Sequence, residues 1–274
     1  MWSYSAQLHE GQQAFSLAYY RLDALLAQVR ARLDTVRAAG SHGSPTQRTE
    51  RDSFATMYED RLTQLRAVED RLVFGRLDNA KGEHRYIGRL GLSDERHEPI
   101  LTDWRAEAAR PFYDATPSSH GDIVMRRHIT LNFREVVGVE DEVLDVHSDQ
   151  VGQASSAGTL TGEGALLASL NAKRTGKMTD IVATIQAEQD RIIRADLNQA
   201  VVVQGGPGTG KTAVALHRAA YLLYTHRRAL ERTGVLLIGP RSTFLLSIDM
   251  VLPSLGGTGV VSLTISTPTP GIIT

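Results

Sequence analysis

The chain has 274 residues, which is room for about two domains, and its 30 lysines and arginines nearly balance 31 aspartates and glutamates. The formal charge of −1 excludes a uniformly basic coat for nucleic acid, and the absence of cysteine excludes a disulfide scaffold, a cysteine-ligated zinc site and a thiol nucleophile. No apolar run approaches the length of a membrane span and the first residues lack a secretory signal, so we expect a cytoplasmic protein without membrane contact.

Residues 1–74 have the apolar spacing of a helical hairpin. The first helix carries a coiled-coil stripe of residues at intervals of seven: Leu8, Phe15, Leu22, Val29 and Val36. Glycines and a proline at 40–45 end this helix, and a second helix, capped by Thr49 or Ser53, shows the same spacing at Tyr58, Leu65 and Leu72. The antiparallel hairpin is either part of a helical bundle or an arm whose tip, residues 40–48, reaches into a partner.

Residues 75–147 read as a small β-rich module. Short strands are predicted at 85–90, 121–125, 128–133 and 136–139, and they suggest a small antiparallel sheet or barrel. We interpret the acids at 140–142 as solvated side chains of a surface hairpin and the basic cluster at 126–128 as a solvated strand end. The run at 148–162 is poor in large apolar residues and predicts a linker or loop.

Residues 163–263 alternate helices with buried strands. Helices are predicted at 165–170, 179–185, 213–224 and 241–252, and buried parallel strands at 200–203 and 234–239. This alternation is typical of a partial α/β domain of the βαβ type. The overall class is therefore mixed α/β, with a tail at 264–274 that is rich in Pro, Thr and Gly.

A glycine-rich loop between the predicted strand and helix carries the chemistry. It matches G-x-x-x-x-G-K-[ST] at every fixed position. Backbone N–H groups of such a loop converge on phosphate oxygens, the lysine reaches the β- and γ-phosphates, and the hydroxyl of Thr212 would ligate Mg²⁺. We therefore expect ATP and Mg²⁺ to bind at Gly205, Gly206, Pro207, Gly208, Thr209, Gly210, Lys211 and Thr212.

A glutamine upstream of the loop is a candidate for reading the base. Gln189 lies sixteen residues before Gly205 and resembles the glutamine motif of superfamily 1 helicases, in which that side chain contacts adenine. An amide can bond the N6 and N7 atoms of adenine together. Gln186, three residues earlier, would lie on nearly the same helix face and is the competing candidate.

Taken together, these segments resemble the UvrD/Rep superfamily, and within it the HelD-type, helicase IV-like ATPases. The resemblance rests on residues 181–189, 205–218, 235–241 and 251–255, and it extends upstream through 58–62, 86–90, 103–106 and 111–113. It implies a partial RecA-like P-loop domain and a hairpin arm that enters the secondary channel of RNA polymerase. It also implies a motor that frees stalled polymerase from nucleic acid, so that this part would meet DNA or RNA only indirectly.

Several features depart from this family. Hydrolysis needs a carboxylate after a second strand and arginines from a second lobe. Asp249 lies in a predicted helix and the acids at 140–142 come before the loop, so neither suits that role. We therefore expect weak hydrolysis or none, and our hypothesis for the departures is a truncated or frameshifted reading frame. Two alternatives remain open: a polymerase-binding module with a vestigial nucleotide site, and a small self-contained P-loop ATPase or kinase.

Overall fold

The computed structural model describes residues 4–38, 44–145, 181–230, 233–249, 251–255 and 260–264. The chain divides into two compact units, Met1–Asn171 and Ala172–Thr274. Both combine helices with strands, so the predicted mixed α/β class is confirmed. None of the helices in the described ranges is long and apolar enough to cross a bilayer. The predicted linker at 148–162, the predicted helix at 165–170 and all but the first residue of the tail at 264–274 lie outside those ranges.

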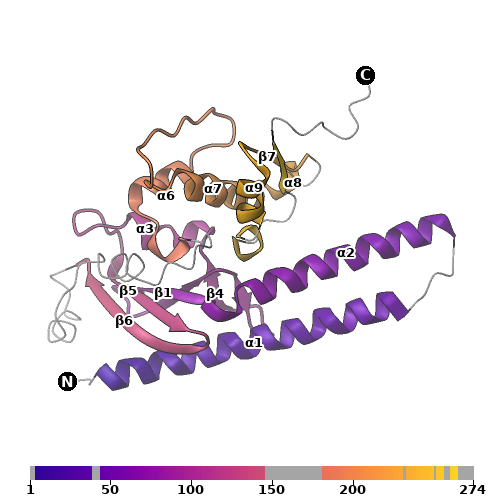
Figure 1. Ribbon diagram of the computed structural model, residues 1–274. Coiled ribbons are helices and arrows are strands. Elements are labelled where there is room, and N and C mark those ends of the chain that lie inside the picture. The colour runs from indigo at the N-terminus through magenta and orange to yellow at the C-terminus, as the bar shows by residue number, and fades with distance from the viewer. Residues whose placement is uncertain are drawn as a thin grey trace. The chain divides into compact units, whose positions relative to one another are not determined.

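Two long helices open the first unit, α1 (Tyr4–Ala38) and α2 (Pro45–Ala67), and they run antiparallel side by side (Figure 1). The prediction that Thr49 or Ser53 caps the second helix was wrong. The helix begins at a capping box in which the Ser44 hydroxyl accepts from the Gln47 N–H and the Gln47 side chain accepts from the Ser44 N–H. Pro45 takes the first helical position, where a missing N–H costs nothing.

The hairpin packs on a sheet through one end only. Its buried residues join the sheet in a single apolar core: Phe15, Leu22, Leu65 and Leu72 with Val73, Leu92, Leu101 and Ile129. Toward the other end, the side chains of Val29 and Val36 are only half-buried, and Phe54 and Met57 of α2 are about half exposed, at 50% and 49%. The heptad stripe is therefore buried most completely where it meets the sheet.

The sheet has six strands in the order β3-β4-β2-β1-β5-β6. They are β1 (Val73–Asn79), β2 (His84–Gly88), β3 (Leu92–Ser93), β4 (Pro99–Asp103), β5 (Ile123–Asn132) and β6 (Glu135–Val143). Pairing is antiparallel except between β2 and β4. Short helical segments complete the unit: η1 (Glu69–Arg71), η2 (Glu107–Ala109) and α3 (Pro111–Asp114). The two short strands expected at 121–125 and 128–133 are one strand, β5.

Charged residues of β5 and β6 pair across the strands. This corrects the interpretation that the basic cluster at 126–128 and the acids at 140–142 are solvated. Arg127 donates to both carboxylate oxygens of Asp141, at 2.5 and 2.7 Å, and Arg126 donates to Glu142 at 2.6 and 2.9 Å. The pairs lie directly opposite each other in the register. Their side chains are mostly buried, so these residues hold the sheet together and are not available to a ligand.

The second unit is built around a long helix and two parallel strands. Its elements are η3 (Val182–Thr184), α6 (Ala187–Ile193), α7 (Lys211–Thr225), α8 (Arg227–Leu230), β7 (Val235–Gly239), α9 (Ser242–Asp249), η4 (Leu252–Leu255) and β8 (Val260–Thr264). β7 and β8 pair in parallel, with α9 in the crossover between them. This is a strand–helix–strand unit, but not the one expected, which began with a strand at 200–203 and did not include β8.

Four local predictions for this unit need correction. Residues 201–206 are not a strand, and Val202 is 83% exposed, because no described strand pairs with them. β7 forms as expected but is not buried on both faces, since Leu236 and Ile238 are 57% and 61% exposed. The described part of the expected helix at 179–185 is the short turn η3, and the helix expected at 241–252 ends at Asp249.

Candidate nucleotide-binding site

The glycine-rich loop leads directly into α7. Gly208 and Gly210 have φ values of +80° and +86°, a left-handed conformation that side chains other than glycine rarely adopt. A methyl group at Gly208 would have no neighbour within 4 Å, whereas one at Gly205 would lie 2.6 Å from the Thr209 hydroxyl. The loop from Gly205 through Thr209, including Pro207, is exposed. Its backbone is thus tightly turned and open to a ligand.

The side chains of Lys211 and Thr209 donate hydrogen bonds to backbone carbonyls of the loop itself. The Lys211 ammonium donates to the carbonyls of Gly205 and Gly206, at 2.7 and 2.6 Å, and the Thr209 hydroxyl donates to the Gly206 carbonyl at 2.9 Å. The ammonium is therefore folded over the turn. Thr212 lies half-buried in the first turn of α7, beside Lys211 in sequence.

Gln189 lies against this loop. A methyl group added at Gly210 would come within 3.1 Å of the Gln189 Nε2. Gln189 and Gln186 form a reciprocal capping box at the start of α6, in which the Gln189 Oε1 accepts from the Gln186 N–H at 3.1 Å. An amide oxygen has two lone pairs, so Oε1 can accept a second bond. Gln189 is half-buried and Gln186 exposed, so the structure favours Gln189 over Gln186 as the residue next to the loop.

Two residues of α7 that the sequence analysis did not single out connect α6 to this helix. The Arg218 guanidinium donates to backbone carbonyls at the end of α6, and the imidazole of His217 accepts from the Ile181 N–H at 3.3 Å. Burial lowers the pKa of the Arg218 guanidinium from its ordinary value, in keeping with its partly desolvated position. The only signal in the sequence is their spacing of six and seven residues from Lys211, about two helical turns.

This arrangement fits the triphosphate of a nucleotide with a base held beside it. Open backbone N–H groups, the positive end of a fifteen-residue helix and a lysine meet at one place. The hydroxyl of Thr212 is the candidate ligand for Mg²⁺. Within the described ranges, no group of three His, Asp or Glu side chains is arranged to hold a metal ion by itself.

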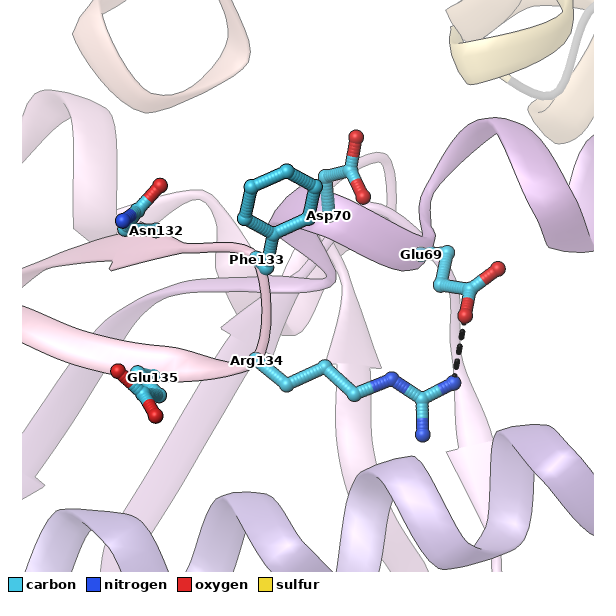
Figure 2. A pocket seen from close by; sticks show the side chains of 6 residues that line it. All are labelled: Glu69, Asp70, Asn132, Phe133, Arg134 and Glu135. Carbon is cyan, nitrogen blue, oxygen red and sulfur yellow. Dashed lines mark hydrogen bonds and ion pairs between the residues drawn. The ribbon is translucent and has the colours of Figure 1, made fainter.

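The hollow drawn in Figure 2 belongs to the first unit and contains none of the predicted site residues. It has a volume of about 450 Å³ and is lined by Glu69, Asp70, Asn132, Phe133, Arg134 and Glu135. Arg134 donates to Glu69 at 2.7 Å and to both oxygens of Asp23 at 2.8 Å. The hydrogen bond to Asp23 is the main reason why the pKa of Arg134 is raised. These bonds fasten the β5–β6 turn to α1 and η1, which is a structural role.

Comparison with known families gives two matches. The family model described as DNA helicase IV HelD, N-terminal domain, matches residues 8–156, which is more than half of the chain. The model described as UvrD/REP helicase N-terminal domain matches residues 185–238, the stretch that contains Gln189, the glycine-rich loop and α7. No curated protein matches the chain. The resemblance seen in the sequence is confirmed by these matches.

Proposed function

Because the chain belongs to the family of the HelD N-terminal domain, and its second unit carries a UvrD/Rep-like segment, we propose that it is the ATP-binding N-terminal part of a helicase-like motor. The observation that supports ATP most directly is the closeness of Gln189 to Gly210, where a methyl group would lie 3.1 Å from the amide nitrogen. In this proposal, the amide that reads the base and the turn that binds phosphate are side by side.

Each part of the site has a role in this proposal. The N–H groups of the turn and of the first turn of α7 would hold phosphate oxygens, and Lys211 would exchange its two carbonyl partners for the β- and γ-phosphates. The hydroxyl of Thr212 would ligate Mg²⁺, and Gln189 would bond the adenine edge. Bound ATP would supply the phosphoryl group whose transfer drives a motor of this kind.

We expect this chain to bind ATP without turning it over at an appreciable rate. Hydrolysis also needs a carboxylate that holds Mg²⁺ and orients water. In the second unit, Asp190 is bonded to Arg194, Asp196 accepts from the Asn198 N–H, and Asp249 accepts from Ser262. None of these three bonds involves the glycine-rich loop.

Equilibrium binding of a fluorescent ATP analogue tests the nucleotide site. Loss of the Lys211 ammonium should weaken binding by about 1.5–3 kcal/mol, as for other hydrogen bonds to charged groups. Lys81→Ala, at an exposed lysine of the first unit, is the matched control and should bind like the wild type. Absence of binding by the wild type would indicate a vestigial site, and equal binding by Lys211→Ala would contradict the assignment of the loop as the nucleotide site. Steady-state turnover above background would indicate a self-contained ATPase.

We further propose that RNA polymerase is the partner and that the α1–α2 hairpin contacts it, so that DNA or RNA is met only indirectly. The exposed apolar side chains of Phe54 and Met57, on the part of α2 away from the sheet, support this. Copurification with RNA polymerase should fall when both are changed to serine. Tyr20→Ser is the control, because Tyr20 is 74% exposed but lies on the part of α1 that packs on the sheet. Unchanged recovery of the Phe54/Met57 double variant would contradict the proposal.

A further inference from the structure

Two neighbouring side chains of α7 hold both ends of the segment that carries Gln189. This segment, residues 181–196, contains η3 and α6. His217 bonds to its first residue and Arg218 to its last. Both side chains project from the helix that begins at the glycine-rich loop, so the two tethers and the loop share one rigid element.

Arg218 caps the carboxyl end of α6. Its NH1 donates to the carbonyls of Ile192, Ile193 and Ala195, at 3.2, 3.2 and 2.5 Å, and its NH2 donates to the Asp196 carbonyl at 2.9 Å. The last carbonyls of a helix have no partner within the helix, and they carry its partial negative charge. A guanidinium at this position therefore satisfies several acceptors at once.

His217 fixes the beginning of the segment. Its Nε2 accepts from the Ile181 N–H at 3.3 Å, and its Nδ1 lies 2.6 Å from the Ala213 carbonyl. An imidazole that accepts at Nε2 must carry its proton on Nδ1, so this ring is neutral and donates to Ala213. The side chain is 1% exposed, which gives the bond to Ile181 little competition from water.

α6 has seven residues and needs such support. Isolated helices shorter than about 12 residues are marginal in water, so the place of α6 depends on its contacts with the rest of the unit. Gln189 lies in the first turn of this short helix, and a paired contact with a base tolerates errors of only about 0.5 Å. Relaxing the capped end would therefore displace the amide while leaving the loop intact.

We propose that Arg218, together with His217, is a positioning residue that holds Gln189 against the loop and thereby sets a preference for adenine over guanine nucleotides. This inference rests on the proposed ATP site. Arg218 does not contact the nucleotide in this scheme and acts only through the position of Gln189.

Competition binding with ATP and GTP on the whole chain tests the proposal. Gln189→Ala should weaken ATP binding about tenfold and leave GTP binding nearly unchanged, because only the adenine contact is lost. Arg218→Met keeps the aliphatic stem and should have the same selective effect. The double variant should be no worse than either single variant, since the two residues act through one contact. Arg228→Met, at an exposed arginine of α8, is the matched control and should bind as the wild type does.

A second readout needs no nucleotide. Hydrogen exchange in the free protein should speed up at the amides of α6 in Arg218→Met while α7 keeps its protection. For the other tether, His217→Gln offers an acceptor near the position of Nε2 and should retain the preference for ATP, whereas His217→Phe should lose it.

The outcomes separate the two proposals. Failure of the wild type to bind ATP would overturn the ATP site and the positioning role together. Lys211-dependent binding in which Arg218→Met keeps the full preference for ATP would overturn the positioning role alone. So would an equal loss of ATP and GTP binding in Arg218→Met, because that pattern would mean a general disturbance of the loop.

Discussion

A largely buried histidine of β5 should make the stability of the first unit depend on pH. Burial, reinforced by the charge of Arg126, lowers the pKa of His128 from 6.5 to about 4. The unfolded chain therefore binds a proton between pH 6.5 and 4 that the folded chain does not. The contribution of His128 to the free energy of unfolding is fully present above pH 6.5 and declines as the pH falls toward 4. Linkage gives a loss of roughly 1 to 2 kcal/mol at pH 5 relative to pH 7.

Urea unfolding followed by the fluorescence of Trp104, a fully buried residue of the same unit, measures this loss. His128→Phe removes the titrating group and keeps an aromatic ring on Phe112, whose ring centre lies 4.9 Å away. Between pH 7 and 5, the free energy of unfolding of this variant should fall by roughly 1 to 2 kcal/mol less than that of the wild type. His97→Asn, at an exposed histidine, should behave as the wild type does. Identical pH dependence in the wild type and in His128→Phe would refute the reasoning.

Substitutions at three further places test the packing and the loop. Ser44→Ala removes the capping box of α2 and should lower the free energy of unfolding by about 1 kcal/mol, measured by circular dichroism in urea. Asp141→Ala leaves the buried guanidinium of Arg127 unpaired and should cost about 3 kcal/mol, seen as a lower Tm, whereas Asp141→Asn should cost less. Gly210→Ala and Gly208→Ala both strain a left-handed residue by roughly 1 kcal/mol. Only Gly210→Ala also crowds Gln189, so it should reduce the preference for ATP over GTP more than Gly208→Ala does.

The parts of the fold that could be predicted from the sequence are those that depend on local sequence patterns. Heptad spacing predicts the two long helices, and the match to G-x-x-x-x-G-K-[ST] predicts a turn followed by a helix, which is seen at Gly210 and α7. The spacing between Gln189 and the loop predicts a glutamine near the loop, and a methyl group added at Gly210 would lie 3.1 Å from the Gln189 Nε2. Each of these features depends on residues close together in the chain.

Features that depend on distant partners could not be predicted. The run at 200–203 has the composition of a strand, but a strand also needs a neighbour to complete its hydrogen bonds, and no described strand provides one. The charges at 126 and 127 looked solvated because the sequence does not reveal that Glu142 and Asp141 lie opposite them in the register. Arg218 was missed for a similar reason, since its four acceptors are backbone carbonyls, which have no signature in the sequence.

The candidate site is held together by a helix and not by a sheet. Residues 201–204 approach the loop without strand partners, whereas Lys211, His217 and Arg218 all project from α7. The first reaches the loop, and the other two reach the start and the end of the segment that carries Gln189. The distance between the glycine-rich loop and the Gln189 amide is thus set along one rigid element. A change in total nucleotide affinity would report on the turn, and only a change in the ratio of ATP to GTP binding would report on the tethers.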